Sequence, residues 1–285
     1  METSPAADRI TSRFVAGATL ERALAVCQKL NGEGVLVSLD HLGESVASLK
    51  EAEYARDAYL AALDHIAQLG LRATLSIKLT QLGLDFSEEQ CSSYVESLVE
   101  RARSMARVVE VDMESSKYVG RTLALVSRLH AKYGSVRAVV QAYLYRSETD
   151  VEDLCRQSIP VRLCKGAYHE SSDVAFKKKP DVDTNYLRLM IRLLDAGTNP
   201  AIASHDETIL QRAAEYARER KMDPQHFEFQ MLYGIRRDLQ RRLIADGYRL
   251  RLYVPYGNAW YPYFMRRLAE RPANVLFLVR NLLRS

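Results

Sequence analysis

The chain has 285 residues and a formal net charge of +4, and 47% of its residues are hydrophobic while 27% are charged. This composition supports a sizeable core, excludes disorder over most of the chain and gives no reason to expect a nucleic-acid partner. The length fits two small domains or one barrel domain of roughly 250 residues.

The cysteines and the first residues of the chain bear on its compartment. Cys27, Cys91, Cys155 and Cys164 form no C-x-x-C pair, so we expect no disulfide framework and no metal site. The segment Met1–Asp8 is unlike a signal peptide, and no apolar run reaches the roughly 20 residues that span a membrane. We therefore expect a cytoplasmic protein with reduced thiols.

Eight apolar runs of strand length alternate with amphipathic segments along the chain. A helix is predicted over Ile10–Leu30, ahead of the first strand. Strands are predicted at residues 34–40, 73–79, 108–113, 136–144, 160–164, 201–204, 227–232 and 250–254. Helices are predicted at residues 45–69, 87–106, 118–132, 183–195, 207–220 and 236–245, and Thr149 with Asp150 marks one more helix start.

This alternation predicts a closed, TIM-like (β/α)8 barrel over residues 34–285, preceded by a short helical segment at residues 1–33. A doubly wound open sheet is the alternative, and it usually carries a glycine-rich phosphate turn after its first strand. Here the first strand ends in Asp40-His41-Leu42-Gly43-Glu44, which lacks that turn.

In such a barrel the active site forms at the carboxyl ends of the strands. Any one polar residue there is more often part of the scaffold than of a site. Buried polar groups without partners cost about 1–3 kcal/mol each, so a whole ring of them predicts a site. The ring comprises Asp40 and Glu44, Lys78, Asp112 and Glu114, Gln141 and Tyr143, Arg162 and Lys165, Ser204 and His205, Glu228 and Gln230, and Tyr253.

Two segments narrow the chemistry of this site. Residues 161–168 (VRLCKGAY) carry two cations and a glycine that allows close approach to the backbone, which suits a ligand with phosphates. Residues 263–270 (YFMRRLAE) place Arg266 and Arg267 after the last strand, where guanidinium groups could grip a carboxylate.

Three questions stay open at the level of these patterns. A Schiff-base aldolase would place its lysine where Lys78 or Lys165 stands. A barrel that binds a ligand without catalysis would show the same ring of polar groups. The apolar segment at residues 275–283 fits either a closing helix packed on the barrel or a helix that docks on a membrane.

Eight motifs, taken in order, resemble those of proline dehydrogenase, in its monofunctional, FAD-dependent bacterial form. They are SIKL at 76–79, VDME at 111–114, QAY at 141–143, VRLCKGAY at 161–168, ASH at 203–205, EFQMLYG at 228–234, RLYVPYG at 251–257 and YFMRRLAE at 263–270. The resemblance implies a flavoprotein on a distorted barrel that oxidises L-proline to Δ1-pyrroline-5-carboxylate, the first step of proline catabolism to glutamate. It also implies a membrane quinone as electron acceptor, and hence peripheral contact with the inner face of a membrane.

The resemblance also implies roles for individual residues on the proline side of the site. Arg266, Arg267 and Lys78 would bind the proline carboxylate, and Asp112 would pair with Lys78 and orient it. The proline ring would pack against Tyr168, Leu232 and Tyr253. Glu44 would form an ion pair with one arginine, and Glu270 would face the same pocket from a last helix that leans over the barrel mouth. The residues expected to act in catalysis are Lys78, Asp112, Tyr253, Arg266 and Arg267.

On the cofactor side, the resemblance implies FAD contacts, with Arg162 near the flavin N5 atom. These contacts would come from Gln141, Arg162, Leu163, Lys165, Gly166, Ala167, Ser204, His205, Glu228 and Gln230. Because the chain ends at Ser285, we expect no fused pyrroline-5-carboxylate dehydrogenase domain and no DNA-binding segment. A separate pyrroline-5-carboxylate dehydrogenase would then consume the product.

Overall fold

The computed structural model describes residues 13–259. Eight parallel strands follow one another in sequence order, and the last pairs with the first to close a barrel. This confirms the predicted (β/α)8 barrel and rules out the open-sheet alternative. The strands are β1 (Leu36–His41), β2 (Ala73–Ile77), β3 (Val109–Val111), β4 (Val136–Gln141), β5 (Val161–Cys164), β6 (Ala201–Ala203), β7 (Glu228–Leu232) and β8 (Leu250–Tyr256).

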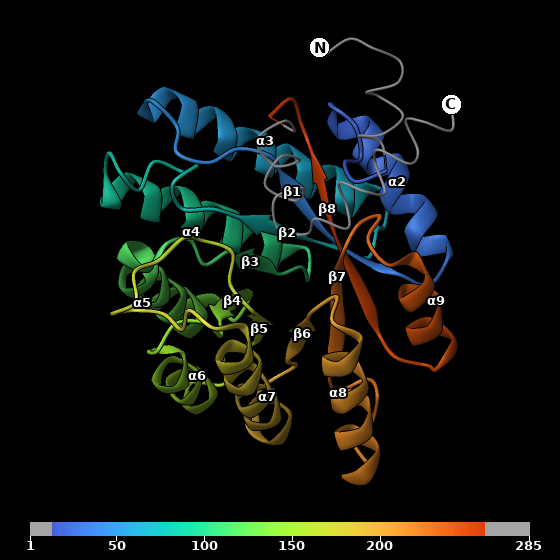
Figure 1. Ribbon diagram of the computed structural model, residues 1–285. Coiled ribbons are helices and arrows are strands. Elements are labelled where there is room, and N and C mark those ends of the chain that lie inside the picture. Colours follow the sequence, from blue (N-terminus) through green and yellow to red (C-terminus); the bar gives the residue numbers. More distant parts are fainter. Residues whose placement is uncertain (1–12, 260–285) are drawn as a thin grey trace, which may run out of the picture.

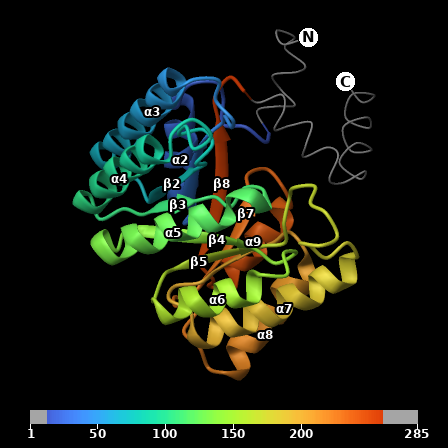
Figure 2. The ribbon, with the colours of Figure 1, turned by 90° about the vertical axis from the view of Figure 1, so that its left-hand side faces the viewer.

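Helices surround the strands (Figure 1), and the apolar side chains of the strands are buried. In Figure 2, α6, α7 and α8 lie side by side along one flank of the barrel. The described helices are α2 (Leu20–Gly32), α3 (Leu49–Gln68), α4 (Glu88–Ser104), α5 (Ser116–Tyr133), α6 (Ser147–Arg156), α7 (Lys179–Ala196), α8 (Glu207–Glu219) and α9 (Arg237–Ala245). The helix start predicted at Thr149 and Asp150 falls inside α6, one turn after its observed beginning.

Hydrogen-bonding side chains start several of these helices. Ser48 accepts the backbone N–H of Glu51 ahead of α3, and Ser87 accepts that of Gln90 ahead of α4. Each side chain thus satisfies a backbone donor that has no partner within the helix. At α3 and α4 the helix therefore begins where the local sequence provides a cap, and the predicted starts there agree with the structure to within a few residues.

The N-terminal helix begins later than predicted. Residues 13–19 are not helical, and α2 starts at Leu20. The backbone N–H of Ala16 donates to the carbonyl of Pro255 at 2.8 Å, and Gly17 accepts from the N–H of Gly257 at 2.9 Å. The stretch ahead of α2 is held against the end of β8, so its backbone groups are not available for a helix.

The interior of the barrel below its mouth is filled by charged side chains rather than by aliphatic layers alone. The carboxylate of Glu110 is fully buried and accepts from Arg162 at 2.6 Å and from Arg137 at 3.4 Å. Glu228 accepts from Arg137 and from Arg251, both at 2.7 Å. We call these five side chains the interior network. Each carboxylate meets at least two guanidinium groups, which offsets the cost of burying the charges.

The guanidinium groups of this network change the titration of its carboxylates. Burial by itself would raise the pKa of Glu110, but Arg162 and Arg137 outweigh it and lower the pKa to about 2. The pKa of Glu228 is also lowered, because Arg251 and Arg137 outweigh its burial. Both carboxylates are therefore ionised at neutral pH. Within residues 13–259 no helix has both the length and the apolar character needed to cross a bilayer.

Candidate active site

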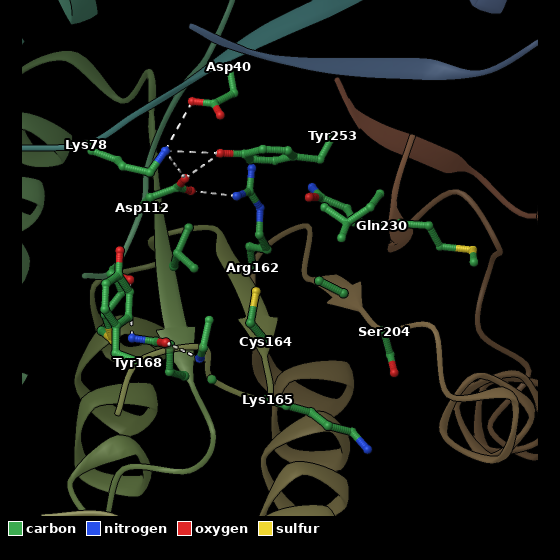
Figure 3. A pocket seen from close by; sticks show the side chains of 18 of the residues that line it. Asp40, Lys78, Asp112, Arg162, Cys164, Lys165, Tyr168, Ser204, Gln230 and Tyr253 are labelled. Atoms are coloured by element: carbon green, nitrogen blue, oxygen red, sulfur yellow. Dashed lines mark hydrogen bonds and ion pairs between the residues drawn. The ribbon is translucent and has the colours of Figure 1, made fainter. Parts of the chain in front are cut away.

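A cavity of about 680 Å³ opens at the carboxyl ends of the strands. Every strand, or the residue just after it, contributes at least one lining side chain (Figure 3). In chain order from β1 to β8 these include Asp40, Lys78, Asp112, Gln141, Arg162, Ala203, Gln230 and Tyr253. The cavity therefore occupies the position at which TIM barrels carry their chemistry, and its size suits a small-molecule ligand.

Four charged groups and one phenol meet at one end of this cavity (Figure 3). The ammonium of Lys78 lies 3.2 Å from Oδ1 of Asp40, and 3.8 Å from Oδ2 of Asp112. The hydroxyl of Tyr253 donates to the same Oδ2 of Asp112 at 2.8 Å, and Nη1 of Arg162 donates to its Oδ1 at 2.7 Å. We call these five side chains the charged cluster.

This geometry adds to the role that was expected for Asp112. Asp112 does form an ion pair with Lys78, as expected, but the nearer carboxylate is that of Asp40. Asp112 also bridges Tyr253 and Arg162. Asp40 had been recognised only as a polar residue at a strand end. The signal that could have identified it is an aspartate near the end of an otherwise apolar strand that neighbours the strand leading to Lys78.

Asp40 is also the least satisfied member of the charged cluster. Its side chain is 1% exposed, and among residues 13–259 its Oδ2 atom has no hydrogen-bond partner. Burial raises the pKa of Asp40, with the charge of Asp112 adding to this effect, while Lys78 opposes it. A buried acceptor that lines a cavity and lacks a partner is suited to receive a hydrogen bond from a ligand.

Lys78 remains protonated in this setting. Burial by itself would lower its pKa, but the carboxylates of Asp40 and Asp112 outweigh it and raise the pKa above its usual value. A Schiff-base lysine needs the neutral amine, which forms when the pKa is lowered. The environment of Lys78 therefore opposes the aldolase alternative. Lys165, the other lysine considered, lies in ion pairs with Asp183 and Asp206.

The opposite end of the cavity is formed by residues after β4, β5 and β6. The amide of Gln141 accepts the N–H of Ala167 at 3.1 Å and donates to the carbonyls of Met113 and Glu114. Nε2 of His205 accepts the N–H of Leu232 at 2.8 Å, which places the ring proton of the neutral imidazole on Nδ1. These contacts hold the loops in place around the cavity.

Gly166 has a packing requirement besides the ligand contact expected of it. The sequence suggested a glycine against which a ligand could pack closely. In the structure its φ is +132°, and a Cβ atom there would lie 2.3 Å from the ring of Tyr143. The backbone at this position therefore needs glycine to pass the aromatic ring of the neighbouring loop.

Of the predicted site residues within 13–259, all but two line this one cavity. Those that line it are Glu44, Lys78, Asp112, Gln141, Arg162, Lys165, Gly166, Ala167, Tyr168, Ser204, His205, Gln230, Leu232 and Tyr253.

Glu228 and Leu163 were expected to contact the cofactor, and neither side chain lines the cavity. Glu228 is the first residue of β7 and belongs to the interior network, two residues below Gln230 on the same inward face. Leu163 alternates with Arg162 and is buried in the core, and its carbonyl accepts from Tyr186 at 3.0 Å. The motif brought both residues into the prediction, but strand depth and alternation separate them from the site.

Arg266, Arg267 and Glu270 lie outside the described residues. The same holds for the predicted helix over the barrel mouth and for the arginine partner expected for Glu44. Their assignments remain predictions.

Comparison with known proteins places the chain in a family. The family model for proline dehydrogenase matches residues 23–280. Proline dehydrogenase 1 of Bacillus subtilis subsp. natto is 39% identical over 273 residues, which cover 96% of this chain and 90% of that protein. Proline dehydrogenase of Deinococcus radiodurans is 37% identical, with 97% and 91% covered. The bifunctional protein PutA of Escherichia coli is 27% identical, and the match covers 94% of this chain but 24% of that protein.

The fold is also similar to that of a larger protein of known structure. Proline utilization A from Bdellovibrio bacteriovorus, inactivated by N-propargylglycine, superposes with a TM-score of 0.85 at 25% identity. The match covers 91% of this chain and 32% of that chain, so the similarity concerns about a third of the larger protein. With a matching family model over most of its length and near-full-length relatives at 37–39% identity, this chain belongs to the proline dehydrogenase family of oxidoreductases.

Proposed function

We propose that this chain catalyses the FAD-dependent oxidation of L-proline to Δ1-pyrroline-5-carboxylate and transfers the electrons to a quinone. One observation supports this most strongly. A partly buried lysine pairs with two carboxylates, which favour its protonated form, at the mouth of a barrel whose chain belongs to the proline dehydrogenase family. A fixed ammonium inside the cavity is well suited to orient an amino-acid carboxylate.

The residues around the cavity fit FAD. Val139, Ala203 and Met231 provide apolar surface for a flat ring system, and Lys165 and Ser204 provide polar groups for the rest of the cofactor. Cations with hydrogen-bonding hydroxyl groups are the chemistry that phosphates require. Gln141, Arg162, Gly166, Ala167, His205 and Gln230 complete the set of proposed contacts, from which Glu228 and the side chain of Leu163 are now left out.

The proposed reaction breaks a C5–H bond of proline, removes that hydrogen with its two bonding electrons as a hydride, and forms the C5=N bond as the nitrogen loses one proton to solvent. When bound, FAD would supply the acceptor for the electrons and the C5 hydrogen. Lys78 would hold the carboxylate at the far end of the substrate and so fix the position of C5, which removes orientational freedom before the reaction. Arg162 would place a positive charge beside the acceptor ring and stabilise the negative charge that develops there.

The charge balance of the cluster explains why more cations are needed. Lys78 and Arg162 are matched by Asp40 and Asp112, so these four groups carry no net positive charge. A substrate carboxylate would enter this site unfavourably unless further cations came with it. Arg266 and Arg267 would supply them, with Glu44 and Glu270 as their acidic neighbours. Tyr168, Leu232 and Tyr253 would pack around the ring and exclude water.

The proposed electron acceptor is a membrane quinone, which would require peripheral contact with a membrane. The product would pass to a separate pyrroline-5-carboxylate dehydrogenase. The apolar segment at residues 275–283, which the sequence linked to such contact, lies outside the described residues. Sedimentation of the protein with vesicles would test the contact, and proline-dependent reduction of a quinone held in those vesicles would test the acceptor.

The visible absorption spectrum tests the core of the proposal. The purified protein should show flavin absorption, and anaerobic addition of L-proline should bleach it. A protein that binds FAD but is not bleached by proline would contradict the proposed substrate. A protein that shows no flavin absorption, even after incubation with FAD, would contradict the proposed cofactor.

The arginine pair has a separate test. Arg266→Met and Arg267→Met should each raise the KM for proline strongly while the flavin spectrum remains. Arg241→Met is a suitable control, because Arg241 lies on α9, away from the cavity. Loss of flavin with unchanged proline affinity would place the arginines on the cofactor side instead.

A further inference from the structure

The loop between β5 and α7, residues 165–178, contributes its first four residues to the cavity wall and is attached near its middle to the start of α5. The carboxylate of Glu170 accepts the backbone N–H of Ser116 at 2.6 Å and the hydroxyl of the same serine at 2.5 Å. Ser116 is the first residue of α5, 54 positions earlier in the chain. This contact joins two loops of the barrel mouth that follow β5 and β3.

Glu170 takes the place of a local cap on α5. Ser115 is the N-cap residue, and within the described structure its side chain makes no capping hydrogen bond. The first N–H groups of a helix have no partners inside it, and the helix dipole favours a negative charge at this end. A carboxylate that accepts two hydrogen bonds there is a strong attachment, and here it comes from the loop rather than from the helix itself.

A second attachment lies three residues earlier on the same loop. The N–H of Ala167 donates to the side chain of Gln141, whose amide group in turn donates to the carbonyls of Met113 and Glu114. The two attachments therefore hold the loop to the same short segment, the residues that lead from β3 into α5.

Tyr168 lies between these two attachments. Its side chain is half-buried and lines the cavity on the other side from Ser204 (Figure 3). Because the backbone is held at Ala167 and again at Glu170, the intervening tyrosine has little freedom to move outward. Release of the contact at Glu170 would leave Tyr168 held through Ala167 on one side, while the next contact on the other side lies four residues on, where the carbonyl of Ser172 accepts from the hydroxyl of Tyr145 at 3.0 Å.

We propose that Glu170 is a positioning residue that fixes Tyr168 as a wall of the substrate pocket and thereby determines how strictly the enzyme selects the unsubstituted proline ring. The inference rests on the proposed function, since it assumes that the substrate ring packs against Tyr168. The competing explanation is that Glu170 stabilises α5 and has no effect on the pocket. A cap that acts on stability alone would leave substrate selectivity unchanged.

The test uses the FAD-bound enzyme and three variants. Glu170→Ala removes the attachment, and Glu170→Gln keeps an oxygen that can accept the N–H of Ser116. Asp173→Ala removes an exposed carboxylate from the same loop and serves as the matched control. We expect Glu170→Ala to raise the KM for proline about tenfold with kcat changed less than about threefold, the pattern of weakened ground-state binding. The KM for proline of Glu170→Gln should stay within about threefold of that of the unaltered enzyme. Asp173→Ala should have the same KM as the unaltered enzyme.

Two further readouts separate positioning from stability. The ratio of kcat/KM for 4-hydroxyproline to that for proline should rise at least about fivefold in Glu170→Ala, because a looser wall accepts a substituted ring. Amide hydrogen exchange in residues 165–178 should be faster in Glu170→Ala than in Asp173→Ala. If Glu170→Ala does not fold, Ser116→Ala removes one of the two hydrogen bonds from the other side and should shift the same ratio in the same direction.

The outcomes are distinguishable from failure of the proposed function. If the unaltered enzyme is not bleached by proline, the proposed function fails, and this inference fails with it. If the unaltered enzyme oxidises proline but Glu170→Ala only lowers the melting temperature, with unchanged KM and substrate ratio, Glu170 is a helix cap and the inference alone is overturned. Unchanged hydrogen exchange in residues 165–178 would overturn it as well.

Discussion

Arg162 and Asp112 form an ion pair that joins the interior of the barrel to its mouth. Nη1 of Arg162 donates to Oδ1 of Asp112 at 2.7 Å, although they lie on or beside β5 and β3, which are not neighbours in the barrel. The same guanidinium reaches down to Glu110 at 2.6 Å. Arg162 is thus shared by the interior network and the charged cluster, so a change in either is expected to affect the other.

Asp112→Asn should lower kcat/KM for proline by about 10–100-fold. The reason is that an amide cannot replace a carboxylate that accepts hydrogen bonds from both Arg162 and Tyr253. Hydrogen bonds to charged groups contribute about 1.5–3 kcal/mol each. Steady-state kinetics with a soluble electron acceptor measures the effect. Asp64→Asn is the control, since Asp64 pairs with Arg101 on the surface. Equal kcat/KM values for the two variants would contradict the role given to Asp112.

Asp40→Asn should move the alkaline limb of the proline kcat/KM profile to lower pH. The carboxylate of Asp40 raises the pKa of Lys78 against the effect of burial, so its removal lets burial lower that pKa. Lys78 would then lose its proton, and the enzyme its carboxylate-binding charge, at a lower pH than before. The pH dependence of kcat/KM for the variant and the unaltered enzyme measures the shift. An alkaline limb that stays in place would show that Lys78 does not control it.

Gly166→Ala should destabilise the protein by about 1–3 kcal/mol and weaken flavin binding, because an alanine is strained at φ +132° and its Cβ would collide with Tyr143. Gly120→Ala is the contrasting variant. Gly120 lies inside α5, and an added Cβ would meet nothing within 4 Å, so alanine should stabilise the helix by about 0.5–1 kcal/mol. Thermal melting, followed by protein unfolding and by flavin release, distinguishes the Gly166→Ala variant from the Gly120→Ala variant. A Gly166→Ala variant as stable as the Gly120→Ala variant would be inconsistent with the packing described.

The interior network should make the protein sensitive to acid. The pKa of Glu110 is lowered from 4.5 to about 2, so its stabilising effect is complete above pH 4.5 and is lost as the pH falls toward 2. The free energy of unfolding, measured by urea titration, should fall across this window. In Glu110→Gln, if the variant folds, the free energy of unfolding should depend less on pH across this window.

Glu96 provides the comparison for this acid effect. Its pKa is also lowered to about 2, through hydrogen bonds from Lys132 and Arg128 on the protein surface. Salt screens exposed pairs far more than buried ones, so added salt should weaken the contribution of Glu96 and leave that of Glu110 largely unchanged. If added salt changed the free energy of unfolding equally in the Glu96→Gln and Glu110→Gln proteins, this would argue against an interior network shielded from solvent ions.

The sequence by itself was sufficient for the barrel and for most of the residues around its cavity. Strand and helix patterns are local, since they depend on which neighbours along the chain are apolar, and the eight strands were found close to their observed bounds. Strand ends of a parallel barrel meet at one face, so Lys78, Asp112, Arg162 and Tyr253 could be assigned to one site without knowledge of the coordinates.

Only the tertiary structure decided which of these residues touch. Asp40, rather than Asp112, is the nearer partner of Lys78, and Glu228 lies below the site although Gln230 lines it. The contact between Glu170 and Ser116 spans 54 positions and carries no local signal. Strand register, depth along the barrel axis and loop path determine these relationships. They arise from closure of the whole barrel, and for this reason a pattern read along the chain identifies the residues of the site but not their pairing.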